Sequence, residues 1–225
     1  YQKVIDGARA VVENYRPHIH IEPDWPMVEL GSISEWITKG TTPTTNGHKF
    51  TDSGVNFIKI ENIYQDGEID TRKISFIDQK THDSQQRSQL MENDILFSIA
   101  GSLGIVGFVR RFVLPANTNQ ALAIIRVKNG VLPRYIFHFL RSKAVQSSLS
   151  QLKVGVAQYN LSLKQVSEIK IPLPSITIQK EIVAETEAEV ALVNANRELI
   201  ARFEQKIQTV LAHIWGEGDI EMGED

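Results

Sequence analysis

The sequence contains no cysteine. This absence excludes a disulfide framework, a thiol nucleophile and a thiolate metal site, and it is typical of proteins from a reducing cytoplasm. No run approaches 18 apolar residues, and the first residues, Tyr1-Gln2-Lys3, do not resemble a signal peptide. We therefore expect a cytoplasmic protein without membrane contact. Because the first residue is Tyr rather than Met, we also expect a fragment of a longer protein.

Motifs that carry catalysis are missing as well. The sequence has no Walker loop, no Gly-x-Ser-x-Gly, no His-Glu-x-x-His and no Asn-Pro-Pro-Tyr/Phe-like tetrapeptide. Gly101, Gly104 and Gly107 follow a spacing of three, which differs from the dinucleotide-binding fingerprint and favours a tight crossing between strands. His18 and His20 lack an obvious third metal ligand, so solvated linker histidines are the better interpretation. The sequence predicts a binding module with no metal, rather than an enzyme.

What the sequence does contain is a run from Ile178 to Trp215 without glycine or proline. Apolar residues recur in it every seven residues, with others three or four residues away, which is the seam of a coiled coil. We assign dimerisation to this seam, where the amide of Asn196 would fix register. Its residues are Ile182, Val193, Asn196, Ile200, Phe203, Ile207, Val210 and Ile214.

This helix would be roughly 57 Å long at 1.5 Å per residue. No other segment of the chain is long enough to cover the seam, so we expect a partner helix and a homodimer. The alternative is a long helix that folds back on its own domain. The helix also carries much of the negative charge, because residues 176–225 have 4 Lys and Arg against 11 Asp and Glu. Residues 25–175 have 17 against 12, a balance that permits nucleic-acid binding without showing it.

Four segments follow from these patterns. Residues 1–24 form a helix and a linker, residues 25–175 a globular domain, residues 176–215 the long helix, and residues 216–225 a disordered acidic tail. Within the globular domain, alternating apolar residues predict strands at 55–60 and 73–77. Residues 94–99 are predicted to form a buried strand, and residues 121–127 a further strand. Asp66-Gly67 predicts a tight turn, and Pro133 predicts the start of a helix that continues to about residue 151.

Two polar segments of this domain suit nucleic acid. Residues 38–49 form a loop rich in hydroxyls with two lysines, which are suitable donors for phosphate oxygens. Residues 78–89 are almost wholly polar and rich in Gln, a side chain that pairs with base edges. A solvated loop explains the first segment equally well. A plain surface helix explains the second slightly better.

Several stretches of the chain together form a recognisable series. They are Trp25–Gly31, Gly40–Pro43, Gly54–Asn62, Glu92–Ser98 with Gly101–Gly107, Asn119-Gln120, Gly155–Ser162, Ile171–Pro174 and Gln179–Ile182. In order and spacing over residues 25–215, this series resembles the specificity subunit of type I restriction-modification enzymes, as one target-recognition domain with its following conserved helix.

The resemblance implies an α+β (mixed α/β) fold, with a twisted, largely antiparallel sheet, flanking helices and one long C-terminal coiled-coil helix. It implies a domain that reads one half of a bipartite site on double-stranded DNA, and a helix that docks methyltransferase and restriction subunits. S-adenosylmethionine, ATP and magnesium are then expected only in those partner subunits. Family subunits usually carry two such halves and this chain has one, which agrees with pairing of two copies. Residues 1–24 would be the end of a preceding methyltransferase region.

On this interpretation, Lys and Arg hold phosphates while Gln, Asn and Arg read bases. The candidates for DNA binding are Lys39, Thr41, Thr42, Lys49, Gln85, Gln86, Arg87, Gln158, Tyr159 and Asn160. Two rival functions are a stand-alone DNA methyltransferase or nuclease, and a structural coiled-coil adaptor. Composition and periodicity alone predict only an α/β domain with a dimerising helix.

Overall fold

The computed structural model describes residues 2–152 and 160–215, and the chain divides into two compact units. The larger unit is Arg16–Thr186, and the smaller one combines the residues up to Tyr15 with those from Glu187 onward. The larger unit includes residues that the sequence assigned to the linker and to the long helix. Ile19 and Gln179 explain this extension, because both are buried in it.

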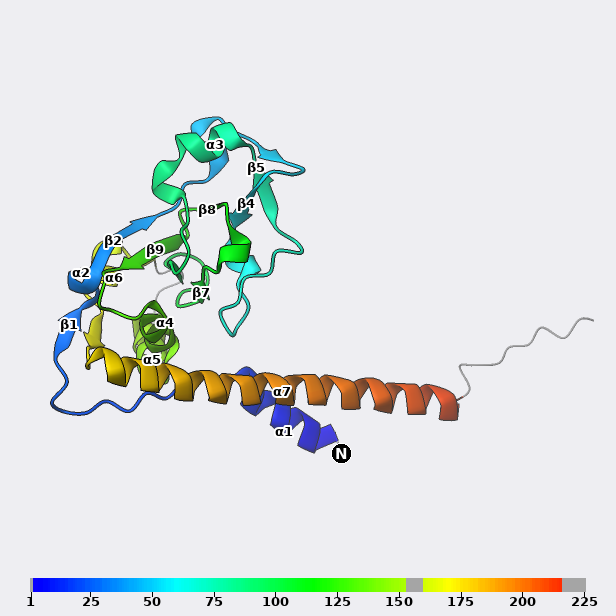
Figure 1. Cartoon of the computed structure of the whole chain (residues 1–225). Helices are drawn as coiled ribbons and strands as arrows, with labels where there is room; N and C mark the ends of the chain where they lie inside the picture. The colour runs from blue at the N-terminus through cyan, green and yellow to red at the C-terminus, as the bar shows by residue number, and fades with distance from the viewer. Residues whose placement is uncertain (1, 153–159, 216–225) are drawn as a thin grey trace, which may run out of the picture. The chain divides into compact units, whose positions relative to one another are not determined.

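A four-stranded antiparallel sheet forms the centre of the larger unit (Figure 1). Its order is β2 (Ser34–Lys39), β9 (Leu122–Val127), β6 (Ile95–Ser98) and β7 (Val106–Phe108). All four residues of β6 are buried, as expected for a central strand with an almost continuous apolar run. The β6–β7 connection contains Gly101 and Gly104 at positive φ, so the glycine spacing does serve a crossing between strands.

A second sheet has the order β3 (Phe50–Thr51), β5 (Ser75–Ile77), β4 (Val55–Ile58) and β8 (Ala116–Thr118). Only the β4–β8 pair is parallel. This sheet lies with α3 (Gln79–Ser84) at the end of the unit away from β1 and α2 (Figure 1). Asp66-Gly67 forms the predicted turn, which is closed by a bridge between Ile63 and Ile69.

Helices and a small third sheet complete the larger unit. Strands β1 (Met27–Glu29) and β10 (Lys170–Pro172) pair antiparallel, next to α2 (Leu30–Ile33) and α6 (Leu163–Ser167). Helices α4 (Pro133–Arg141) and α5 (Lys143–Leu152) follow β9 along the chain. The 3₁₀ helices are η1 (Pro43–Asn46), η2 (Ile60–Asn62), η3 (Gln86–Ser88) and η4 (Arg111–Val113). The predicted α+β fold with largely antiparallel sheets is confirmed.

The single helix predicted from Pro133 to residue 151 is wrong in one respect, because it is broken into α4 and α5. Ser142 between them is extended, with ψ 155°. Its N–H donates to the Phe139 carbonyl at 3.0 Å, and its own carbonyl accepts from Gln146 N–H at 3.0 Å. Ser142 therefore ends one helix and starts the next without glycine or proline.

A buried ion pair ties β6 to β9. Asp94 is fully buried, and its two carboxylate oxygens each accept a hydrogen bond of 2.7 Å from the Arg126 guanidinium. Asp94 also accepts from the backbone N–H of Met91 at 2.7 Å, and the Arg126 guanidinium lies over the Trp36 ring. These three hydrogen bonds offset part of the cost of burying the carboxylate, but burial still raises the pKa of Asp94 above its ordinary value.

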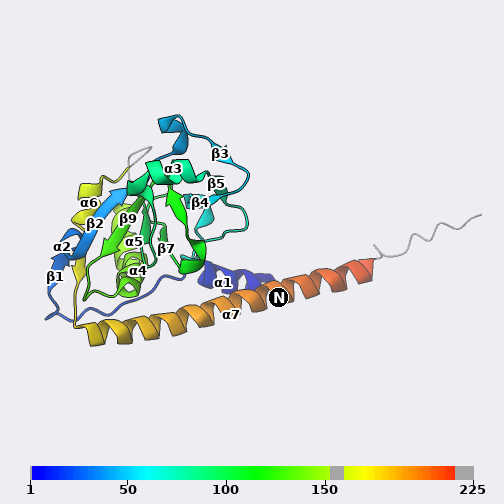
Figure 2. The ribbon, with the colours of Figure 1, turned by 45° about the horizontal axis from the view of Figure 1, so that its top comes forward.

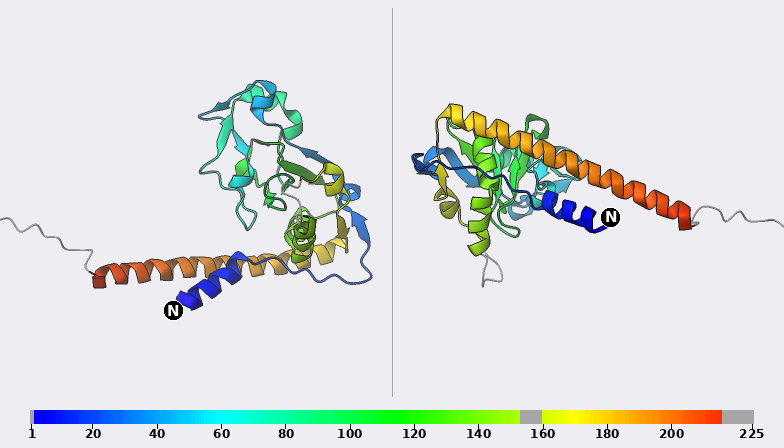
Figure 3. Two further views of the ribbon diagram at one scale, coloured as in Figure 1. Left: turned by 180° about the vertical axis from the view of Figure 1, so that it is seen from behind. Right: turned by 90° about the horizontal axis from the view of Figure 1, so that it is seen from below.

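The long helix α7 (Ile176–Trp215) contributes to both units. In the larger unit, Val183 is buried and Ile182 packs against the apolar core. The Gln179 side chain accepts from Leu132 N–H at 2.9 Å and donates to the Pro174 carbonyl at 2.9 Å. In the smaller unit, α1 (Gln2–Glu13) runs beside the later turns of α7 (Figure 3). None of the described helices combines the length and apolar character needed to span a membrane.

Candidate nucleic-acid interface

The polar loop that follows β2 is anchored to β8 at its start. A Cβ on Gly40 would lie 2.0 Å from the Thr118 carbonyl oxygen, so only glycine fits this close approach. Thr41 N–H donates to the same carbonyl at 3.0 Å, and the Thr42 hydroxyl bonds to the Gln120 side chain. The loop then forms η1 and turns back, where it presents exposed side chains up to Lys49.

Helix α3 is fixed at its N-terminus by Asp78, whose carboxylate accepts from Thr81 N–H at 2.7 Å. Hydrogen bonds from Thr81 hold the pKa of Asp78 below its ordinary value. The face of α3 and η3 that carries Thr81, Gln85 and Ser88 is buried. The opposite face is exposed and carries Gln79, Lys80, Asp83, Ser84, Gln86 and Arg87.

The loop and α3 contact each other. His48 Nε2 lies 3.2 Å from the Ser84 hydroxyl, and Figure 2 shows η1 beside α3. We refer to the exposed residues of 39–49 and 79–87 together as the polar surface. It carries four cations, Lys39, Lys49, Lys80 and Arg87. One carboxylate oxygen of Asp83 accepts a hydrogen bond from the Gln79 amide at 2.8 Å. The polar surface therefore offers cations and amides in the combination that phosphates and base edges require.

The structure distributes the predicted DNA-binding residues unevenly. Lys39, Lys49, Gln86 and Arg87 are exposed on the polar surface, and Thr41 and Thr42 are half-buried at the base of its loop. Asn160 is exposed on the segment before α6 and outside this surface. The predictions for Gln158 and Tyr159 lie outside the described residues.

The prediction for Gln85 needs correction. Its side chain is only 5% exposed, because it lies on the inner face of the α3–η3 segment. Neither end of its amide has a hydrogen-bond partner among the described residues. Gln85 is therefore part of the interior and is not available to a base edge in this conformation.

Sequence reasoning missed three polar side chains of this region, namely His48, Lys80 and His82. The composition of residues 78–89 marked the segment as polar but could not separate its exposed face from its buried one. His82 is half-buried and contacts the fully buried Asn117 of β8.

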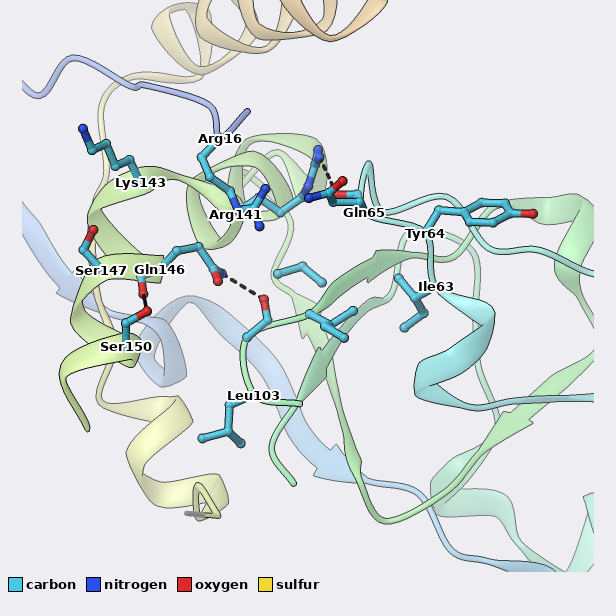
Figure 4. A pocket seen from close by; sticks show the side chains of 13 residues that line it. Arg16, Ile63, Tyr64, Gln65, Leu103, Arg141, Lys143, Gln146, Ser147 and Ser150 are labelled. Atoms are coloured by element: carbon cyan, nitrogen blue, oxygen red, sulfur yellow. Dashed lines mark hydrogen bonds between the residues drawn. The ribbon is translucent and has the colours of Figure 1, made fainter. Parts of the chain in front are cut away.

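A separate cleft of about 690 Å³ lies between α5, the turn at residues 63–65 and the loop at residues 103–106 (Figure 4). Three of its lining residues are basic, namely Arg16, Arg141 and Lys143, and none is acidic. The Arg141 guanidinium lies 5.0 Å from the Phe137 ring centroid and donates to the Gln65 carbonyl at 3.1 Å. The lining suits an anion better than a cation, and none of the predicted DNA-binding residues belongs to it.

The predicted dimerisation residues fall on two faces of α7. In the smaller unit, Val193, Ile200 and Ile207 are half-buried on the face that α1 covers. Two contacts secure this cover: Arg197 donates to the Val12 carbonyl at 3.0 Å, and Arg9 pairs with Glu204. The expectation that no other segment could cover the seam is therefore wrong for this face. Ile182 belongs to the core of the larger unit. The Ile214 side chain is not among those that the structure describes.

The neighbouring face of α7 remains open. Phe203 is 52% exposed and Val210 is 48% exposed, and Asn196, seven residues before Phe203, is exposed as well. Leu192 and Leu199, which the prediction omitted, are 68% and 50% exposed on the same line. We call Leu192, Asn196, Leu199, Phe203 and Val210 the open stripe. Successive members lie four, three, four and seven residues apart, which is the spacing of a coiled-coil contact.

Among residues 2–152 and 160–215, no group of three or more His, Asp or Glu side chains is arranged to hold a metal ion. The cleft beside α5 has no histidine or carboxylate among its lining residues.

Comparison with known proteins identifies the family to which these features correspond. A family model described as "Type I restriction modification DNA specificity domain" matches residues 22–193. The EcoBI specificity subunit of Escherichia coli is 31% identical over 161 residues, which cover 69% of this chain and 32% of that protein.

Solved structures agree at the level of the fold. A chain from a structure on complex assembly and conformational transition of the type I R-M system aligns with a TM-score of 0.68 and 18% identity, over 93% of this chain and 50% of that one. The HsdS subunit from Thermoanaerobacter tengcongensis aligns with a TM-score of 0.61 and 18% identity, over 92% and 51%. This chain thus spans about a third to a half of the length of these relatives.

Proposed function

Because this chain belongs to the family of type I restriction modification DNA specificity domains, we propose that it binds double-stranded DNA and reads one half of a bipartite site. The observation that carries the proposal is the polar surface, where an anchored loop and α3 present four cations beside exposed amides. Membership of this family agrees with the expectation of a non-catalytic specificity component.

The polar surface divides into positioning and reading groups. Lys39 and Lys49 lie on the loop, where they are suited to hold phosphates irrespective of sequence. Gln86 and Arg87 lie next to each other in η3, just after α3, and both side chains can pair bidentately with base edges in the major groove. The buried face of α3 keeps this segment fixed against the second sheet, so that the exposed side chains approach DNA as one unit.

Binding-site selection on variants tests this division. Gln86→Ala relaxes the preference at one base pair and leaves the others unchanged, because a base contact specifies one position. Lys39→Ala weakens binding to all sequences by a similar factor. Lys170→Ala is the matched control, because it removes one exposed cation on β10, at the other end of the unit. Identical effects of the Gln86 and Lys39 variants contradict the assignment.

We further propose that two copies of this chain pair through the open stripe, so that two recognition units address the two halves of the site. Support comes from the coiled-coil spacing of the stripe and from the exposure of its four apolar side chains. The chain also spans about half of each solved relative, so two copies match the length of one relative. The solution mass tests the pairing, and a monomer at all concentrations contradicts it.

The proposed module acts within a larger assembly in the cytoplasm. We propose that methyltransferase subunits, and the restriction subunit with them, dock on it and supply the chemistry. S-adenosylmethionine, ATP and magnesium then bind those subunits and not this chain. Calorimetric titration of the chain with S-adenosylmethionine tests this point. Tight binding supports the rival function of a stand-alone methyltransferase, whereas weak, sequence-independent DNA affinity supports a structural adaptor.

A further inference from the structure

Asn117 joins the polar surface to the interior of the larger unit. It is fully buried in β8, where it pairs with Phe57 of β4 and bridges to Gln89. Its side-chain nitrogen Nδ2 donates to the Gln85 carbonyl at 3.3 Å and to the Ser88 hydroxyl oxygen at 3.1 Å. Its oxygen Oδ1 bonds to Nδ1 of His82. One buried amide therefore contacts three residues of the α3–η3 segment, which follow one another at intervals of three.

The donors and acceptors of this network fix its orientation. The Gln85 carbonyl can only accept, and the Ser88 hydroxyl already donates to that carbonyl at 3.0 Å. Both groups therefore require the NH₂ end of Asn117, which leaves Oδ1 facing His82. Because Oδ1 can only accept, Nδ1 of His82 carries the hydrogen. In neutral His82 the other ring nitrogen, Nε2, is then an acceptor.

His82 is placed where such an acceptor has a use. Its ring is half-buried at the last turn of α3, and Nε2 has no hydrogen-bond partner among the described residues. Lys80, two residues before His82, and Ser84, two residues after it, are exposed on the polar surface. The Gln89 side chain donates to the His82 carbonyl at 2.8 Å, which also holds the backbone of this turn.

We propose that His82 is a specificity-determining residue and that Asn117 is the positioning residue that sets its tautomer. Nε2 of His82 accepts a hydrogen bond from an exocyclic amino group in the major groove, on adenine or cytosine, which are the bases that present a donor there. This inference rests on the proposed function, because it assumes that the polar surface meets DNA. It adds to that function a named base-reading group and the chemical class of its target.

Binding-site selection on His82 variants is the experiment. His82→Phe keeps a ring of similar size but has no acceptor, so the preference for adenine or cytosine at one position falls by roughly fivefold or more. His82→Lys presents donors instead, and moves the preference at that position to guanine or thymine, whose major-groove edges accept. The other positions of the site stay unchanged. His20→Phe is the matched control, because His20 is exposed in the connector before β1 and its replacement leaves every position unchanged.

A structural role alone would lower stability without moving the base preference. A folded His82→Phe variant that selects the same site, with the same preference at every position, therefore overturns the inference. Nitrogen-detected NMR of the imidazole provides a readout without DNA. The wild type shows the Nδ1–H tautomer, and Asn117→Leu releases His82 toward the Nε2–H tautomer. An Nε2–H tautomer in the wild type overturns the positioning role. A wild-type chain that selects no sequence overturns the proposed function itself, and base reading by His82 with it.

Discussion

The open stripe on α7 makes a quantitative prediction for Phe203. Full burial of a Phe side chain contributes about 1.5–3 kcal/mol, and about half of this side chain is exposed in the single chain. Burial of the exposed half of Phe203 on pairing therefore contributes about 1 kcal/mol per copy to the free energy of association, or about 2 kcal/mol per dimer. Loss of this contribution in Phe203→Ala raises the dissociation constant of the dimer roughly 30-fold. Phe203→Glu has a larger effect, because it also places a charge in an apolar contact.

Sedimentation equilibrium over a range of concentrations measures these dissociation constants. The matched control is Gln205→Glu, which adds the same charge two residues away on an exposed side of the helix. Its dimer has the wild-type dissociation constant, and circular dichroism shows equal helix content for all variants. A Phe203→Glu chain that still forms a wild-type dimer refutes the reasoning, as does equal dissociation by Gln205→Glu.

Three further predictions follow from single features. Lys49→Ala reduces the steepness of the fall in log binding constant with log salt concentration by about 1, because each phosphate contact releases about one counterion; an unchanged steepness places Lys49 away from DNA. Arg126→Met leaves Asp94 buried without its partner and lowers the free energy of unfolding by about 3–5 kcal/mol, and addition of Asp94→Asn restores part of this loss in urea denaturation. Hydrogen bonds that Thr81 donates to Asp78 lower the pKa of this carboxyl group in the folded state, so the stabilising contribution of Asp78 is present above the unfolded pKa of about 3.9 and is lost as the pH falls through the lower, folded pKa. The difference in urea midpoint between the wild type and Asp78→Ala therefore shrinks below about pH 3.9, and a difference that grows on acidification contradicts the assignment.

Regular patterns made much of the fold predictable. The seven-residue repeat identified α7, and the apolar run at residues 94–99 identified β6, because burial on both faces of a strand leaves a continuous apolar sequence. The break at Ser142 could not be predicted in this way. No glycine or proline marks it, and the extended conformation is held by hydrogen bonds of Ser142 to both helices.

The faces of the elements were harder to predict than the elements themselves. Leu199 and Ile200 are neighbours with the same apolar character, yet one is on the open stripe and the other is on the face that α1 covers. Periodicity gives the spacing of such residues but not the partner that covers them. Gln85 is the corresponding case after α3, because a polar composition predicts exposure, whereas tertiary packing buries Gln85 together with Thr81 and Ser88.

The most direct measurement of the central claim is the ratio of two affinities at one salt concentration. One duplex carries the sequence that the wild-type chain enriches from a randomised library, and the other carries the same bases in scrambled order. Sequence-specific recognition predicts at least about a thousandfold tighter binding of the enriched duplex. Equal affinity for both duplexes, with the same dependence on salt, shows that the polar surface only attracts phosphates and contradicts the claim.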